Sequence, residues 1–364
     1  MLHSLQLCRA IACVLVVVAH AVSICALPKY FHWHRFEFLY GLGPVALDTL
    51  FVLSGFIILH VHRRDIGRPH RTARYLYRRA HRVYPAYWVA LLLVLPVFFL
   101  VPSFGDGSQR DPGVIARSLL LLPQPSSQPI LPVSWTMSLE IVFYLAFAVL
   151  VLNRILGLIL FGSWLAFLIV RPDTGTFAGS FLAHPGFICI LGGMIAAEVI
   201  HRYRIPGPGW LVMTGSFALF ARVLFDPTLA NSFPISRIAI GAIGSMALLM
   251  GLAARDLNRP LCMPRWSTRL GDASYSIYLV HYPALSVMTK LTKGLRLDAW
   301  IPLELLFCVF VFTGIGVGVL FYSLVERPLR KFIPWVDPKP KLAAFVPGEE
   351  TEGRPDIEPL RRAA

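Results

Sequence analysis

Charged residues, and acidic ones above all, are scarce in this 364-residue chain. Only 15% of its residues are Asp, Glu, Lys or Arg, whereas 56% are hydrophobic and the mean hydropathy is +0.64. Soluble domains usually carry about 25% charged residues, so this composition excludes a soluble globular protein and predicts several membrane spans. Lys and Arg outnumber Asp and Glu by 34 to 20, which gives a net charge of +14.

Cysteine is also rare, and its spacing is uninformative. The six cysteines are scattered through apolar segments, with no pair at the short spacing that metal ligands show. We therefore expect neither disulfides nor a metal site, and we expect these residues to be buried as small hydrophobic side chains. The sequence shows no internal repeat and no soluble catalytic domain.

Long apolar runs dominate what is present, and they predict an all-α fold, a polytopic transmembrane helix bundle of about ten helices. We expect residues 1–334 to form the transmembrane domain and residues 335–364 to be a disordered cytoplasmic tail. The predicted spans are 5–26, 43–61, 83–102, 136–153, 155–171, 180–200, 209–225, 235–254, 271–290 and 301–324.

The placement of Lys and Arg predicts how the chain is oriented. About two thirds of them fall in the tail and in alternate connections, beginning with residues 61–82, which places both termini in the cytoplasm. Positive charge at the inner face suits anionic lipids or an anionic cytosolic ligand, so we do not expect nucleic acid as a partner. The first span has a second interpretation, a signal peptide cleaved near Ala19-His20-Ala21, but the charge topology is coherent only if this segment is retained.

Two polar residues interrupt the first span. Arg9 and His20 are eleven residues apart, which corresponds to about 16.5 Å of rise and nearly three full turns, so both lie on one face of the helix. A charged side chain at the centre of a membrane helix costs about 2.5–3.5 kcal/mol on insertion scales, so an arginine there is a candidate functional residue. The structural alternative is that Arg9 reaches the interface and His20 satisfies a hydrogen bond in the core.

Two carboxylates in other spans lie at a depth similar to that of His20. Helix rise places His20, Asp48 and Glu140 about 9, 7.5 and 6 Å below the outer surface. A carboxylate bonded to one imidazole nitrogen fixes the tautomer and leaves the other nitrogen as a general base. We therefore expect Asp48 or Glu140 to orient His20, although a purely structural polar cluster would place the same residue types there.

A cationic set precedes the third span. Arg78, Arg79 and Arg82 lie within one helical turn, and Arg9 opens the first helix on the same side. Guanidinium groups match the geometry of phosphate oxygens, which indicates a site for an anionic ligand. Ordinary inside-positive topology is the alternative, and it explains the more scattered arginines of residues 63–74 better than this compact set.

Several motifs follow one another along the chain. Besides Arg9 and His20 they are residues 47–56 (LDTLFVLSGF), 78–85 (RRAHRVYP), 135–144 (WTMSLEIVFY), 270–283 (LGDASYSIYLVHYP) and 325–328 (VERP). In their order and spacing, these motifs make the chain similar to the acyltransferase-3 family of integral membrane acyltransferases, and within it to the exopolysaccharide O-acetyltransferases. The resemblance extends from about Leu5 to Pro334. Thr49, where the family usually has a large apolar residue, and Ile141-Val142, in place of a polar pair, depart from its pattern.

The resemblance implies transfer of an acyl group, acetyl in the first place, from cytosolic acyl-CoA to a hydroxyl of a polysaccharide or lipid-linked sugar in the bacterial inner membrane. A mechanism consistent with it uses His20 as the general base, with Asp48 or Glu140 as the carboxylate that orients the imidazole, and no metal. The donor would be bound by Arg9, Arg78, Arg79, Arg82, Tyr84, Trp135 and Ser138.

Other interpretations remain open from the residues. Direct attack on the thioester is favoured because no Ser or Cys is clearly paired with His20, but Ser54 or Ser138 would allow an acyl-enzyme. A proton-coupled transporter could use Arg9, His20, Asp48 and Glu140 as a relay, although transporters more often show repeated halves. A non-catalytic assembly subunit would leave the buried charges unexplained.

Overall fold

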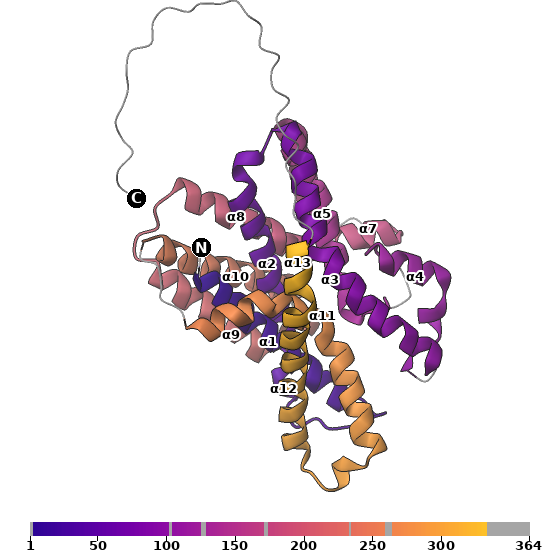
Figure 1. The fold of residues 1–364 in the computed structure, drawn as a ribbon. Helices are drawn as coiled ribbons and strands as arrows, with labels where there is room; N and C mark the ends of the chain where they lie inside the picture. Colours follow the sequence, from indigo (N-terminus) through magenta and orange to yellow (C-terminus); the bar gives the residue numbers. More distant parts are fainter. Residues whose placement is uncertain are drawn as a thin grey trace, which may run out of the picture. The chain divides into compact units, whose positions relative to one another are not determined.

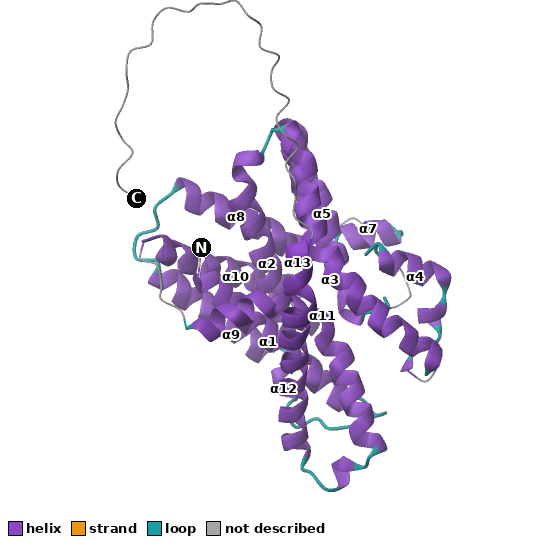
Figure 2. Cartoon of the chain, in the orientation of Figure 1, coloured by secondary structure: helices purple, strands orange, loops and turns teal. Residues whose placement is uncertain are grey.

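Helices account for all the regular secondary structure of the described chain (Figure 2). The computed structural model describes residues 3–101, 104–124, 129–170, 174–232, 234–258 and 264–332, and within these ranges the side chains of 226–235 and 265 are not described. Backbone amides and carbonyls find no hydrogen-bonding partner in lipid, so a spanning segment must satisfy them internally, as a helix does. The all-α prediction is confirmed for this part of the chain.

Each predicted span overlaps one long helix over most of its described residues (Figure 1). These are α1 (His3–Ala26), α2 (Leu42–His62), α3 (Thr72–Leu100), α5 (Trp135–Leu152), α6 (Arg154–Val170), α8 (Gly186–Arg202), α9 (Gly209–Ser232), α10 (Pro234–Asn258), α11 (Arg265–Gly294) and α12 (Leu303–Phe321). Shorter helices are α4 (Pro112–Leu119), α7 (Phe177–Leu182) and α13 (Arg327–Phe332).

Seven of the described helical segments are both long enough and apolar enough to cross a membrane. They contain α1, α2, α3, α5, α8, α10 and α12, whereas α6 and α9 are apolar but shorter over their described residues. The long helix α11 is more polar, because it carries Arg269, Asp272, His281 and Lys290. The protein is thus an integral membrane protein, while the count of ten spans and the cytoplasmic termini stay predictions.

Helix α1 is central to the arrangement that positions the site. It packs against α2, α11 and α12, and α2 in turn packs against α8 and α10. The α2–α8 contact is close because it is made by glycines: a Cβ added at Gly55 would lie 1.8 Å from the Ile190 carbonyl oxygen, and one at Gly193 would lie 1.9 Å from that of Val52. Small residues at such contacts let membrane helices approach closely.

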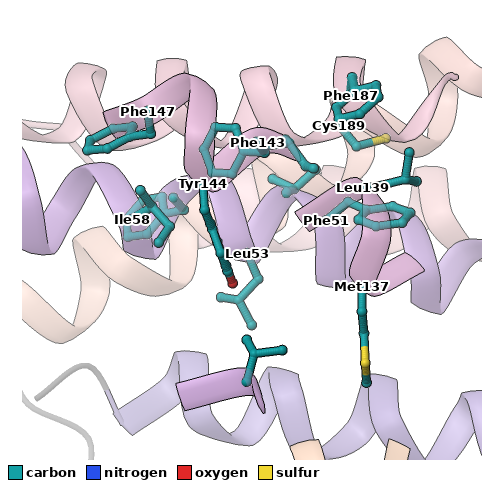
Figure 3. Packing of buried hydrophobic residues seen from close by; sticks show 14 of the residues in the cluster. Phe51, Leu53, Ile58, Met137, Leu139, Phe143, Tyr144, Phe147, Phe187 and Cys189 are labelled. Carbon is teal, nitrogen blue, oxygen red and sulfur yellow. The ribbon is translucent and has the colours of Figure 1, made fainter. Parts of the chain in front are cut away.

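The largest apolar core lies among α2, α3, α5 and α8. Phe56, Tyr87, Phe143 and Phe147 are fully buried in it. Figure 3 shows Tyr144 beside Phe143, with its hydroxyl oxygen turned toward Leu53 rather than into this aromatic cluster. The Tyr144 hydroxyl therefore faces away from the aromatic cluster, and it donates to Glu140 at 3.0 Å.

The outward faces of the helices are also apolar. Met213, Phe217 and Phe312 are more than 70% exposed, as expected for side chains that contact lipid tails rather than water. Cys8, Cys13, Cys25 and Cys189 are free and buried, but the expectation of burial is wrong for Cys308, which is exposed on α12. All described helices belong to one unit, Met1–Pro334; the predicted tail, residues 335–364, lies outside the described residues.

Candidate active site

A deep cavity of about 580 Å³ opens between α1, α2, α3, α5 and α11. Its lining residues on α2 run from Leu47 to Val61, a distance of about 21 Å along the helix. Most of the wall is apolar, and the polar groups are concentrated in a few places. A long, narrow ligand with one charged end would match this distribution.

Three arginines line this cavity: Arg9 of α1, and Arg79 and Arg82 of α3. Arg79 is fixed on several sides. Its Nη2 donates to Nε2 of His62 at 2.6 Å, and its guanidinium lies 5.8 Å from the ring centre of Tyr75 and 5.9 Å from that of Tyr144. Such contacts hold the guanidinium in one orientation without neutralising its charge.

Arg9 and Arg82 are connected to the C-terminal helices. Arg9 Nη1 donates to the Gln6 side chain at 3.1 Å, and Gln6 donates to Asp272 of α11 at 3.4 Å. Arg330 of α13 is close enough to Arg82 to interact with it electrostatically, and it donates to the buried Glu326. Sequence reasoning missed Arg330, which lies far along the chain but only two residues after the family motif VERP.

Glu140 of α5 lies in the cavity wall with both carboxylate oxygens occupied. Ser54 of α2 donates its hydroxyl to Oε1 at 2.5 Å, and Tyr144 donates to Oε2 at 3.0 Å. Tyr144 is one turn after Glu140, so the spacing of four residues was a usable signal for this pair. Both partners of Glu140 are hydroxyl groups, and neither is His20, which the sequence had placed near it.

His20 is bonded to a second histidine. Its Nδ1 lies 3.0 Å from Nε2 of His281 in α11, and its ring meets the edge of Tyr282 at a centroid distance of 5.4 Å. The His20 ring also interacts with the backbone carbonyl of Val16, one turn earlier in α1. No contact of the described residues joins His20 to Asp48 or Glu140, so the expectation that either carboxylate orients the imidazole is wrong. His281 lay inside a recognised motif (270–283), but nothing in its spacing pointed to His20.

The cavity approaches this histidine pair through Tyr278. The Tyr278 ring lines the cavity and lies 5.8 Å from the ring of His281, centre to centre. Its hydroxyl shares a 2.8 Å hydrogen bond with Thr136 at the start of α5. Neither His20 nor His281 lines the cavity, but Tyr278, which does, contacts His281.

Asp48 pairs with Arg222 instead. One Asp48 oxygen lies 3.1 Å from Arg222 Nη2 on α9, and the other accepts from the Cys189 thiol of α8 at 3.7 Å. The backbone of α10 presses on the same carboxylate, since a Cβ at Gly241 would lie 2.1 Å from it. Asp48 thus contributes to a contact among four helices that does not include His20.

Four other residues predicted to bind the donor lie outside the cavity lining. Arg78 is exposed, and the Tyr84 hydroxyl donates to the Leu120 carbonyl at 3.0 Å. Trp135 is 39% exposed and lies against His184, whereas Ser138 is buried. The structure therefore brings together Arg9, Arg79, Arg82 and Glu140 from the predicted set, and it separates the rest.

The comparisons with known proteins agree with the motifs. The family model described as an acyltransferase domain, Acyl_transf_3, matches residues 2–322. The exopolysaccharide production protein ExoZ of Rhizobium meliloti is 30% identical over 308 residues, covering 80% of this chain and 91% of the relative. Acyltransferase MdmB of Streptomyces mycarofaciens is 26% identical, covering 80% and 82%. No solved structure matches.

Proposed function

Because the chain belongs to the acyltransferase-3 family and is an O-acyltransferase, we propose that it moves an acyl group, acetyl in the first place, from cytosolic acyl-CoA to a hydroxyl of a polysaccharide or lipid-linked sugar. The similarity to a protein named for exopolysaccharide production supports a glycan acceptor. The proposed location is the bacterial inner membrane with both termini in the cytoplasm, which gives the donor access from the cytosol. Family membership also leaves the transporter interpretation without support.

The cavity is the observation that carries the proposed donor. CoA has a polyanionic nucleotide end and a thin, uncharged pantetheine arm that ends in the thioester. Arg9, Arg79 and Arg82 offer guanidinium forks for the phosphates, and the apolar shaft along α2 is long enough for the arm. In this pose the thioester lies toward Tyr278 and the histidine pair.

The chemistry requires one proton acceptor. His20 Nε2 takes the proton of the acceptor hydroxyl while its oxygen attacks the thioester carbonyl. The carbon–sulfur bond then breaks, the new ester forms, and the CoA thiolate takes the proton back from His20. His20 is half-buried and does not line the cavity, so the proposed step requires the thioester and the acceptor hydroxyl to meet beside His20, past the cavity lining.

The test combines genetics with mass analysis of the glycan. A deletion strain should lose an acyl increment on its surface glycan, and wild type should restore it. His20→Ala should fail to restore it while accumulating normally in the membrane, because loss of a general base typically costs 10²–10⁴-fold in rate. Full acylation by a well-expressed His20→Ala protein would remove His20 from the mechanism, and accumulation of unexported glycan would favour the transporter.

An acyl-enzyme is a second mechanism that one contact favours. The Ser54 hydroxyl bonds to Glu140 inside the cavity, which is how a carboxylate base activates a serine. Direct transfer predicts that labelled acetyl-CoA leaves no covalent label on the protein when the acceptor is absent. Label on wild type that disappears in Ser54→Ala would instead establish the acyl-enzyme.

A further inference from the structure

We propose that His281 is a positioning residue that fixes the tautomer of His20, so that His20 presents an unprotonated Nε2 to the acceptor hydroxyl. The inference rests on the proposed function, because it assigns the partner of the proposed base. It also replaces the carboxylate that the sequence led us to expect. Two consecutive hydrogen bonds support the inference, one from His281 to a backbone carbonyl and one between the two histidines. If both rings are neutral, only one placement of their protons satisfies both bonds.

The chain begins at a backbone carbonyl. His281 Nδ1 lies 3.0 Å from the carbonyl oxygen of Ile277, one turn earlier in α11. A carbonyl oxygen can only accept, so Nδ1 of His281 carries the proton. In a neutral imidazole the other nitrogen then has a lone pair, so Nε2 of His281 is an acceptor.

The same logic passes to His20. Its Nδ1 is the atom that meets His281 Nε2, at 3.0 Å, so Nδ1 of His20 must be the donor. The lone pair of neutral His20 is thereby assigned to Nε2, the nitrogen that points away from the pair. A general base needs this arrangement, and a carboxylate partner would produce it by the same means.

Burial shows why His281 positions the base and does not itself shuttle protons. His281 is completely buried, whereas His20 is half-buried. Its Nδ1 proton faces the α11 backbone, so a proton arriving at Nε2 would have no onward acceptor. The pair also fits the catalytic cycle, because the Nδ1–H of protonated His20 keeps donating to His281 and stabilises the imidazolium.

The pair is held by rigid elements. His20 and His281 lie on α1 and α11, which pack directly against each other. On one side His281 packs against Tyr278, and on the other Gly314 of α12 leaves room for it, with a Cβ there lying 3.6 Å from the His281 Cβ. A substitution of His281 should therefore keep the size of the side chain, so that only its ability to accept a hydrogen bond from His20 changes.

The experiment compares two nearly isosteric variants, His281→Gln and His281→Met, in nanodiscs with acetyl-CoA and, as acceptor, the unacylated glycan isolated from the deletion strain. Gln keeps a strong acceptor near the position of Nε2, and Met offers only a weakly accepting sulfur. We expect His281→Met to lower kcat roughly 10²-fold with KM for acetyl-CoA unchanged, and His281→Gln to recover most of the turnover. His70→Met, an exposed histidine outside the cavity, is the matched control.

Nitrogen-15 NMR of histidine-labelled protein supplies a signature that a structural role would not produce. The His20 signals are assigned by their loss in His20→Gln. Neutral wild-type His20 should show protonated Nδ1 and bare Nε2, and His281→Met should shift it toward the opposite tautomer. The same tautomer in both proteins, or equal kcat for His281→Met and wild type, overturns the inference. If His20→Ala were also fully active, the proposed role of His20 as the general base would fail with it; an inactive His20→Ala confines the failure to His281.

Discussion

The arginines that line this cavity differ in how many contacts they already make with the protein, and therefore in how available they are to bind a ligand. Arg79 is already fixed by His62 and by two tyrosine rings. Arg82 makes no side-chain hydrogen bond with another described residue, and it interacts electrostatically with Arg9 and Arg330. Several like charges around one cavity repel each other, and an anionic ligand would relieve this repulsion. Arg82 is therefore the best place to test donor binding.

Replacing Arg82 by Ala should raise the apparent KM for acyl-CoA about tenfold or more, because charge-assisted contacts to phosphate are lost. Lys should rescue only in part, since an ammonium group lacks the bidentate fork. The measurement is acyl-CoA binding to purified wild type, Arg82→Ala and Arg82→Lys in nanodiscs. Arg78→Ala is the comparison, because Arg78 is exposed outside the cavity lining, and an equal loss there would mean that surface charge alone attracts the donor.

The Glu140 carboxylate accepts two hydrogen bonds, and an amide in its place could accept only one of them on its single oxygen. Glu140→Gln keeps the shape but offers one acceptor oxygen instead of two, so either the Ser54 or the Tyr144 hydroxyl loses its acceptor. We expect turnover to fall about 10-fold or more while the melting temperature changes by only a few degrees. Unchanged kcat at wild-type expression would show that the carboxylate is needed neither for chemistry nor for positioning.

At the scale of helices, buried polar side chains join elements far apart in the sequence. Glu326, 1% exposed, lies in the π-helix Tyr322–Glu326 that links α12 to α13; it accepts from Ser276 of α11 at 2.5 Å and also from Arg330. The π-helix directly precedes Arg327-Pro328, where the proline cannot continue the regular hydrogen-bond ladder. This junction places Arg330 beside Arg82 at the cavity.

The Asp48–Arg222 pair joins α2 to α9 in the same way. Arg222 is 3% exposed, so Asp48→Asn would leave a buried guanidinium without its counter-charge. Breaking such a pair costs about 3–5 kcal/mol, so we expect a lower melting temperature and less protein in the membrane, with kcat per folded molecule retained. Glu304→Gln, which breaks the exposed pair with Arg35, should cost at most about 1 kcal/mol. A stable but inactive Asp48→Asn protein would return Asp48 to the catalytic site.

At the scale of the whole molecule, the charge distribution predicts the orientation in the membrane. A fluorescent protein fused after residue 334 should fluoresce, and alkaline phosphatase fused within residues 104–124 should be active, because the basic connections are retained in the cytoplasm. An active phosphatase fusion at the C-terminal position would reverse the orientation. The donor cavity would then open away from cytosolic acyl-CoA.

The sequence by itself determined where the helices lie, because in lipid an apolar run of sufficient length has no alternative to a helix. It also determined the family and placed Arg9, Arg79, Arg82 and Glu140 among the candidate site residues, all of which line one cavity. Helical periodicity gives the depth of a residue and its face on its own helix. It does not give the rotation of that helix relative to its neighbours.

Tertiary structure alone decided which polar residues meet. His20, Asp48 and Glu140 have similar predicted depths, yet they bond to His281, Arg222 and the Ser54–Tyr144 pair respectively. Their helices turn these side chains toward different neighbours, and depth contains no information about that rotation. The partner of His20 is 261 residues away and could be identified only once α1 and α11 were packed together.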